Sequence, residues 1–178
     1  MGLSFYKRHV AKWENCDKCL LCKHRTRVVV ARGKIPAEIL FIGEAPGTSE
    51  DVIGLPFVGP AGRLLDHFTN RAINNRHDYA LTNLVCCLPK TDAKDKEEPP
   101  KEAIVACKDR LTEFIKLCQP TLIVCVGTLP RKHVPKLEGI NYAAITHPAA
   151  ILRMDASQQP LAIKRCIVTI EDAISLYL

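Results

Sequence analysis

Three short apolar runs in this sequence each carry or precede a polar residue that could take part in chemistry. Glu44 follows AEILFIG, Asn83 lies within YALTNLVCC, and His147 follows YAAIT. A carboxylate, an amide and an imidazole can together bind a polar ligand and move a proton. A single Asn or His after such a run is more often a turn former or a structural residue. All three at one edge of one sheet would instead form a small polar pocket.

The apolar runs alternate with helical patterns, which indicates a parallel sheet. Strands are expected at residues 37–43, 79–87, 121–127 and 142–146, and helices at 59–74, 104–118 and 160–178. The pattern predicts an α/β fold, a three-layer sandwich with a central four-stranded parallel sheet between helices. Such sheets bind their ligands beyond the carboxyl ends of the strands, where the three polar residues are expected.

The composition favours a single intracellular domain with a basic surface. The chain has 178 residues, 47% of them hydrophobic, which is enough for one packed domain spanning 1–178. The formal net charge is +6, and the Cys-rich segment 1–36 contains nine Lys and Arg against two acids. A solvated charged face is the commoner explanation of such a surface, but it also suits nucleic acid. No apolar stretch is long enough for a membrane span, so we expect a soluble cytoplasmic protein.

Gly, Pro and acidic residues crowd the turn after the first expected strand, GEAPGTSEDVIGLPFVGPAGRLLD. Gly47, Gly59 and Gly62 leave room for the backbone to approach a ligand, and amides at a helix start can meet a phosphate. Glycines in loops more often serve turn geometry alone.

The nine cysteines are either core residues or metal ligands, because disulfides are rare in a reducing cytosol. Cys118, Cys125 and Cys166 lie in apolar runs and are expected to be small buried residues.

The motifs GEAPGTSEDVIGLPFVGPAGRLLD, TNLVCC and THPAAILR, in this order and with cysteines around them, resemble the family 4 (iron-sulfur) uracil-DNA glycosylases of bacteria and archaea. The resemblance extends from about residue 16 to the last helix. It implies the same sheet between helices and supplies an activity. Such enzymes flip uracil out of DNA and hydrolyse its N-glycosidic bond, leaving an abasic site for base excision repair. The implied partner is therefore uracil-containing DNA.

The resemblance implies a role for each pocket residue. Phe57 would stack on the flipped uracil, and the Asn83 amide would read its O4 and N3–H. His147 would donate to O2 as negative charge develops on the departing base. The residues implied to bind the base are Gly43, Ala45, Gly47, Phe57, Asn83 and His147.

The acidic residue that assists hydrolysis is less well defined by the resemblance. The best-known uracil-DNA glycosylases carry Asp where this chain and its own family have Ala45. Glu44 and Glu50 are therefore the preferred candidates, ahead of Asp51, for which bracing the loop is an equally good interpretation. A carboxylate here would stabilise oxocarbenium character on the sugar or position the water.

The residues implied to contact DNA are Gly59, Gly62, Ile151, Leu152 and Arg153. Ile151 and Leu152 would form an apolar wedge that fills the gap left by the flipped base, and Arg153 would hold a phosphate. The alternative is that Ile151 and Leu152 belong to the core.

The resemblance also implies one [4Fe-4S] cluster, held by Cys16, Cys19, Cys87 and Cys107. Zinc accepts the same four thiolates and stays the alternative occupant. Cys22 and Cys86 adjoin these residues, and either could replace a neighbouring ligand; Cys86 stands where the family pattern has Lys. The cluster is expected to be structural, pinning segment 1–36 against the loop near residues 94–101, with no redox step.

The chain departs from the family in the loop after Cys87. Leu88 stands at a position where relatives often have Arg, and the rest of the loop is rich in Lys and Glu. The DNA contact of this loop is therefore expected to be weaker. The loop has no His, which argues against the covalent product trapping of a related group. We expect a monomer. The sequence does not identify protein partners, and replication or repair factors are the candidates.

Two other classes of protein compete with the glycosylase interpretation. One is a non-catalytic DNA-binding domain of the same fold, associated with replication or repair. The other is a zinc-stabilised hydrolase or nucleotide-binding protein, and a nucleotide-binding protein of this kind would carry a Walker phosphate loop. No G-x-x-x-x-G-K-[ST] motif is present.

Overall fold

A five-stranded mixed sheet forms the centre of the computed structural model, which describes residues 2–90 and 98–178. The strand order is β1-β3-β2-β4-β5, and every pair except β1–β3 is parallel. The strands are β1 (Ala31–Gly33), β2 (Ile39–Gly43), β3 (Tyr79–Asn83), β4 (Leu122–Val126) and β5 (Asn141–Ile145).

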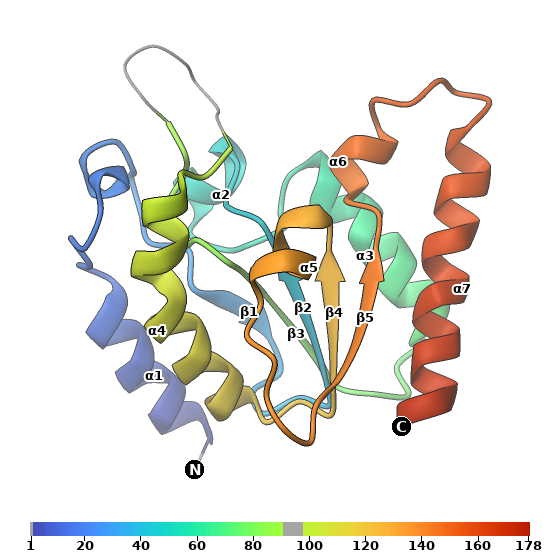
Figure 1. Ribbon diagram of the computed structural model, residues 1–178, viewed down its shortest axis with the longest axis horizontal. Helices are drawn as coiled ribbons and strands as arrows, with labels where there is room; N and C mark the ends of the chain where they lie inside the picture. The colour runs from blue at the N-terminus through green and yellow to red at the C-terminus, as the bar shows by residue number, and fades with distance from the viewer. Residues whose placement is uncertain (1, 91–97) are drawn as a thin grey trace.

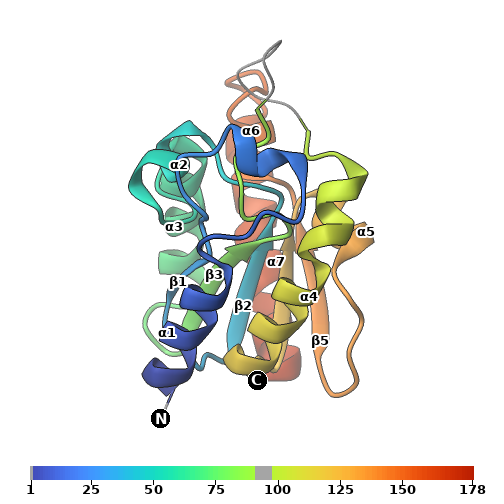
Figure 2. The same ribbon diagram turned by 90° about the vertical axis from the view of Figure 1, so that its left-hand side faces the viewer.

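Helices cover both faces of this sheet (Figure 1). They are α1 (Gly2–Trp13), the 3-10 helix η1 (Leu20–Lys23), α2 (Thr48–Ile53), α3 (Pro60–Ala72), α4 (Lys101–Cys118), α5 (Thr128–His133), α6 (Pro148–Ile151) and α7 (Gln159–Tyr177). Helices α1 and α4 pack side by side on one face, and α3 and α7 pack together on the other (Figures 1 and 2).

Alternation along β2 explains why the sheet has two apolar faces. Leu40 and Ile42 pack into one core with Phe114 of α4, whereas Ile39 and Phe41 pack into the other core with residues of α3 and α7. All five residues of β2 are buried, as are all five of β4, which is the pattern of central strands covered on both faces. The predicted three-layer α/β architecture is therefore confirmed, with helices α3, α4 and α7 where periodicity placed them.

The number of strands was wrong, because the sheet has a fifth strand, β1. Its three residues pair antiparallel with β3, with Arg32 opposite Leu81. A three-residue edge strand leaves no periodic signal in the sequence, so only its pairing with β3 defines it. Segment 1–36 is thus a helix, a short 3-10 turn and an edge strand that completes the sheet.

The long loop after β3 starts differently from the exposed loop that was expected. Leu88 and Pro89 at its beginning are buried. Residues 91–97 lie outside the described residues, and they include part of the loop near residues 94–101 against which the cluster was expected to pin segment 1–36. Among the described helices, none combines the length and apolar character needed to cross a membrane.

Candidate active site

The polar residues predicted to meet do lie at one edge of the sheet. Gly43 at the end of β2 pairs directly with Asn83 at the end of β3. His147 follows the edge strand β5, and it reaches this position across the end of β4, where Gly127 stands. A Cβ at Gly127 would lie 3.2 Å from the Cβ of His147, so the absence of a side chain there makes room for the imidazole.

A cavity of about 260 Å³ lies at this edge of the sheet. It is lined by residues of the crowded turn together with residues from two strand ends: Ala45, Gly47, Glu50, Phe57, Gly59, Gly62, Asn83 and His147. The structure thus brings together five of the six predicted base-contacting residues, with an aromatic ring, an amide and an imidazole around one small space; Gly43 packs behind Phe57 and Asn83. Such a space suits a flat polar ligand.

Close packing fixes the Phe57 ring against the strand ends. Phe57 is buried, and a Cβ added at Gly43 would overlap both its ring and the Asn83 amide oxygen. The Phe57 backbone has φ +57°, in the left-handed region that costs a non-glycine residue roughly 1–2 kcal/mol. A Cβ at Gly62 would overlap the Phe57 carbonyl, so glycine is needed for α3 to begin this close.

Arg32 holds the strained turn at Phe57, a role that was not predicted from the sequence. Its guanidinium donates to the carbonyl oxygens of Pro56 (2.7 Å) and Phe57 (3.0 Å). The same group forms an ion pair of 2.6 Å with Asp66 of α3. Strand β1 therefore serves the site, because it carries the cation that fixes the backbone under the Phe57 ring.

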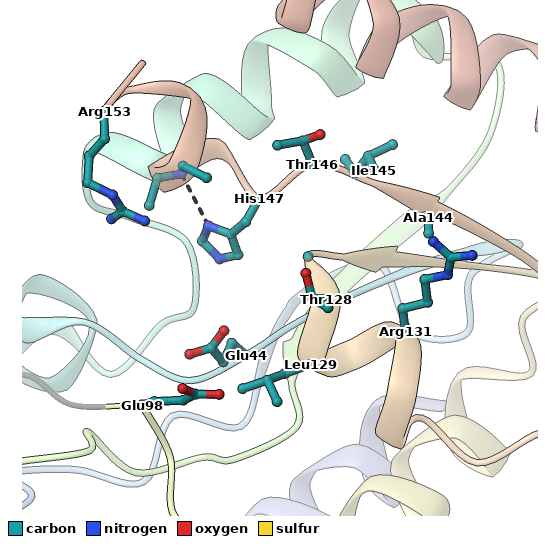
Figure 3. A pocket seen from close by; sticks show the side chains of 13 residues that line it. Glu44, Glu98, Thr128, Leu129, Arg131, Ala144, Ile145, Thr146, His147 and Arg153 are labelled. Carbon is teal, nitrogen blue, oxygen red and sulfur yellow. Dashed lines mark hydrogen bonds between the residues drawn. The ribbon is translucent and has the colours of Figure 1, made fainter.

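The environment of His147 defines its tautomer. The imidazole Nδ1 accepts a hydrogen bond from the Ala149 amide at 3.1 Å, at the start of α6. A neutral imidazole that accepts at Nδ1 carries its proton on Nε2 and can donate from there. Figure 3 shows the ring directed into a larger cavity of about 680 Å³, on the side where Glu44 and Glu98 lie.

Glu44 and His147 approach this larger cavity from opposite sides (Figure 3). Both side chains are half-buried. Arg131, Arg153 and Thr128 also line the cavity, so cationic and hydroxyl groups surround it. Glu98, from the segment before α4, and Arg131 of α5 were not anticipated, because neither lies in a recognisable motif.

The two other acidic candidates bind backbone amides. The Glu50 carboxylate accepts hydrogen bonds from Gly47 (3.0 Å), Val58 (2.9 Å) and Gly59 (2.8 Å), and it is buried. It thereby ties the start of α2 to the start of α3. Asp51 accepts from the amides of Thr26 and Arg27, so it braces the turn against the N-terminal segment, as the alternative interpretation held.

The expected apolar wedge is wrong for one of its two residues. Ile151 is fully buried and packs into the core formed with α3 and α7, because it occupies the inner side of the short helix α6. Leu152 is 44% exposed, and Arg153 is exposed at the rim of the larger cavity. Of the three residues Ile151, Leu152 and Arg153, the last two are therefore accessible to a large partner.

The cysteines expected to bind metal come from three segments that lie close together. Burial raises the pKa of the Cys19 thiol, and negative charge on the nearby thiols of Cys107, Cys16 and Cys22 raises the same pKa further. Burial likewise raises the pKa of Cys87 to about 12, with Arg25 as the largest opposing influence. The Arg25 guanidinium donates to the Cys87 sulfur at 3.6 Å. The segments before η1, after β3 and within α4 therefore share one thiol-rich region.

The thiols of this region are of the right chemical type to bind a metal or a cluster, although their side chains are not arranged in a coordination geometry. Across residues 2–90 and 98–178, no three His, Cys, Asp or Glu side chains already stand at metal-binding positions. Cys86 is completely buried beside Cys87, and Cys107, Cys87 and Cys16 all act on its thiol. Cys118, Cys125 and Cys166 are buried in the two cores, as predicted.

Comparisons with known proteins point in one direction. Residues 30–170 match the Uracil DNA glycosylase superfamily. The chain is 42% identical over 113 residues to a type-4 uracil-DNA glycosylase from Saccharolobus solfataricus, covering 63% of this chain and 50% of that protein. It is 33% identical over 165 residues to a type-4 uracil-DNA glycosylase from Pyrobaculum aerophilum, covering 80% of this chain and 82% of that protein.

Further relatives and a solved structure agree with this match. A type-4 uracil-DNA glycosylase from Archaeoglobus fulgidus is 35% identical over 132 residues, which cover 74% of this chain and 64% of that protein. The alignments thus span from about half to about four fifths of the relatives' own lengths. The crystal structure of Pedobacter heparinus SMUG2 superposes with a TM-score of 0.60 at 14% identity, covering 78% of this chain and 76% of that chain. At that identity, the likeness supports the fold.

Proposed function

The chain belongs to the type-4 uracil-DNA glycosylases, within the uracil DNA glycosylase superfamily, and we propose that it removes uracil from DNA by hydrolysing the N-glycosidic bond. The observation that carries this proposal is the cavity of about 260 Å³ that Phe57, Asn83 and His147 line together. A base must leave the DNA stack to enter such a cavity.

Phe57 and Asn83 select the base in this proposal. The ring of Phe57 stacks on the flipped uracil, and the Asn83 amide donates to O4 and accepts from N3–H, a pattern that cytosine reverses. Gly43 sets the distance between the two side chains, because any side chain at this position would displace both.

His147 stabilises the leaving group. With the Ala149 amide bound to Nδ1, the imidazole presents Nε2–H to the uracil O2. This hydrogen bond strengthens as the base departs with negative charge, so it lowers the barrier more than it tightens substrate binding.

Glu44 is the carboxylate that we assign to hydrolysis. It faces the larger cavity beside His147 (Figure 3), where it would stabilise positive charge on the sugar or position the attacking water. Glu50, the other preferred candidate, is reassigned as a positioning residue. Its three amide hydrogen bonds hold Gly47, Val58 and Gly59, and thereby the turn that carries Phe57.

Leu152 and Arg153 are the residues that we place against the DNA. Leu152 is exposed next to the pocket and would fill the space vacated by the base, while Arg153 would meet a phosphate. Gly59 and Gly62, which the resemblance also places at the DNA, are buried and shape the turn, and the Gly59 amide already binds the Glu50 carboxylate.

One [4Fe-4S] cluster on Cys16, Cys19, Cys87 and Cys107 is the cofactor that fits the thiol-rich region. The supporting observation is the chemistry of the donor set. Four thiols from three segments lie close enough to interact electrostatically. When bound, such a cluster supplies a covalent link between those segments. Zinc is the alternative occupant, and Cys22 or Cys86 could replace a neighbouring ligand. We assign the cluster no redox step.

The cellular setting follows from the proposed substrate. We propose that the chain acts as one domain, residues 1–178, working as a monomer in the cytoplasm where the DNA of the cell lies. Partner proteins in replication or repair stay open.

Excision of uracil from a labelled oligonucleotide, read as strand scission after alkali, tests this function. Protein purified without oxygen should cleave at a single uracil and leave the matched thymine strand intact. His147→Ala should lower the single-turnover rate by roughly 100-fold or more, the usual contribution of a positioned proton donor. His67→Ala, at an exposed position on α3, is the matched control and should keep the wild-type rate.

The opposite result has a definite meaning. Protein that binds the oligonucleotide and holds its cluster, yet gives no scission, would overturn the enzyme assignment. The non-catalytic DNA-binding domain would then be the better description.

A further inference from the structure

Arg110 of α4 is a buried cation to which no function has been assigned above. It is 2% exposed and among the largest fully buried side chains of the protein. None of the ion pairs formed by residues 2–90 and 98–178 includes it. Its Nε is a buried donor without a hydrogen-bond partner among those residues. A buried charge without a counter-charge costs several kcal/mol, so this arrangement calls for an explanation.

The other guanidinium nitrogens of Arg110 all bind the end of strand β3. Nη1 donates to the Thr82 hydroxyl at 2.9 Å, and Nη2 donates to the carbonyl oxygens of Asn83 (2.5 Å) and Leu84 (3.0 Å). The Thr82 hydroxyl in turn donates to the Val30 carbonyl. Arg110 therefore fixes the backbone of the residue that reads the base in the proposed function.

One cysteine of the thiol-rich region lies on the same helix as Arg110. Cys107 is three residues earlier on α4, so the two side chains share a face of the helix, and both are buried. The carbonyl of Leu84, which Nη2 also binds, lies only two residues before Cys86 and three before Cys87. Arg110 thus binds the end of β3 and shares a face of α4 with Cys107, one of the thiols that would hold the cluster.

We propose that Arg110 is a positioning residue that couples the metal cluster to the base pocket. This inference rests on the proposed cluster and on the role of Asn83. A [4Fe-4S] group on four thiolates carries net negative charge, which supplies the counter-charge that Arg110 lacks among the described residues. Held in this way, the guanidinium keeps the carbonyls of Asn83 and Leu84 in place. A cluster with no redox step would still determine how well uracil is recognised.

Three variants of the intact holoprotein separate this role from simple packing. Arg110→Gln removes the charge, Arg110→Lys keeps it, and Lys108→Gln removes an exposed charge from the same helix as the matched control. The first readout is the loss of visible cluster absorbance after a ferrous chelator is added. We expect Arg110→Gln to lose its cluster at least about tenfold faster than wild type, and Arg110→Lys and Lys108→Gln within about threefold of wild type.

The reduction potential of the cluster is a second readout, which a packing defect alone would not shift in a defined direction. Loss of a nearby positive charge disfavours the more negative, reduced cluster, so the potential should fall in Arg110→Gln and stay near wild type in Arg110→Lys. The third readout is the ratio of affinities for uracil and thymine oligonucleotides, which should decrease in Arg110→Gln.

Each result supports or overturns the coupling. Cluster lifetime and potential that are unchanged in folded Arg110→Gln would overturn it. If Arg110→Gln does not fold, Arg110→Lys decides. A wild-type cluster lifetime in that variant supports the role of charge, and a lifetime at least about tenfold shorter than that of wild type refutes it. If wild-type protein excises no uracil but the cluster readouts behave as expected, the electrostatic role of Arg110 stands and the proposed activity fails.

Discussion

A methyl group added at Gly43 would disturb both side chains that are proposed to contact the base. In Gly43→Ala the new Cβ would overlap the Phe57 ring and the Asn83 amide oxygen, and it would lie 3.1 Å from a second ring carbon of Phe57. These atoms belong to side-chain ends, so they can move, whereas the paired strands β2 and β3 cannot. The pocket should therefore deform while the sheet stays intact.

The expected magnitudes differ for folding and for activity. Overpacking of a buried position costs about 1–3 kcal/mol of stability. A displacement of about 1 Å in a reacting group can lower a rate by about 100-fold, equivalent to about 2.7 kcal/mol of transition-state stabilisation. We expect Gly43→Ala to remain folded and to excise uracil at least about 100-fold more slowly than wild type.

Thermal unfolding and single-turnover excision measure the two effects separately. Gly139→Ala is the control, since Gly139 has φ +76° and no atom lies within 4 Å of a Cβ built there. That variant carries backbone strain of roughly 1–2 kcal/mol and leaves the pocket untouched. Its melting temperature should fall by a few degrees, and its excision rate should stay at the wild-type level.

Two outcomes would refute this reasoning. Folded Gly43→Ala that excises uracil within about threefold of the wild-type rate would mean that the positions of Phe57 and Asn83 do not limit activity. Equal rate losses in Gly43→Ala and Gly139→Ala would mean that activity follows stability alone.

Two further predictions concern residues outside the pocket. Arg32→Ala leaves the Phe57 carbonyl without its donor and Asp66 without its cation, so we expect a loss of about 2–3 kcal/mol in unfolding free energy together with slower excision; Arg32→Lys should recover part of both, and an excision rate unchanged in Arg32→Ala would contradict the positioning role. Burial lowers the pKa of His9 from its usual 6.5 to about 4, with Arg110 adding to the effect. Below pH 6.5 the unfolded chain binds a proton that the folded chain does not, so stability should fall between pH 6.5 and 4 by up to roughly 1.4 kcal/mol per pH unit. Denaturant titrations of wild type and His9→Gln check this, and the same slope in both proteins would contradict it.

The four parallel strands were predictable because each lies in a short apolar run, although the run around β3 was expected to continue to Cys87 and the strand ends at Asn83. Strand β2 is buried on both faces, and so is β4, which makes their signal independent of tertiary detail. Strand β1 could not be found in this way. Its three residues are defined by hydrogen-bonding partners on β3, nearly fifty positions later in the chain, and local sequence contains no record of that pairing.

Neighbouring residues with similar chemistry were the least predictable part of the site. Glu50 and Asp51 are adjacent on α2, yet one binds amides of the turn and the other binds amides of the N-terminal segment. Ile151 is the last residue of α6 and Leu152 follows it directly, yet the first is fully buried and the second is exposed. A step of one residue rotates a helical side chain by about 100°, so motif membership does not determine direction.

The two positioning arginines had no signal in the sequence at all. Arg32 lies 24 to 34 residues from the groups that it binds, and Arg110 lies 26 to 28 residues from its own. A single Arg in an amphipathic helix or at a strand edge is normally read as a solvated side chain. Only the fold shows that both guanidinium groups bind backbone carbonyls beneath the pocket.

These contacts change which acidic residue is left for the reaction. The turn after β2 contains three acids in eight residues, but Glu50 and Asp51 satisfy five hydrogen bonds from the backbone amides of Gly47, Val58, Gly59, Thr26 and Arg27. Protonation of either carboxylate would weaken these hydrogen bonds, and for Glu50 it would also loosen the turn that carries Phe57. Glu44 lines the larger cavity together with His147. The positive sugar and the negative base of the transition state would therefore be met by one acid and one imidazole on opposite sides of the same space.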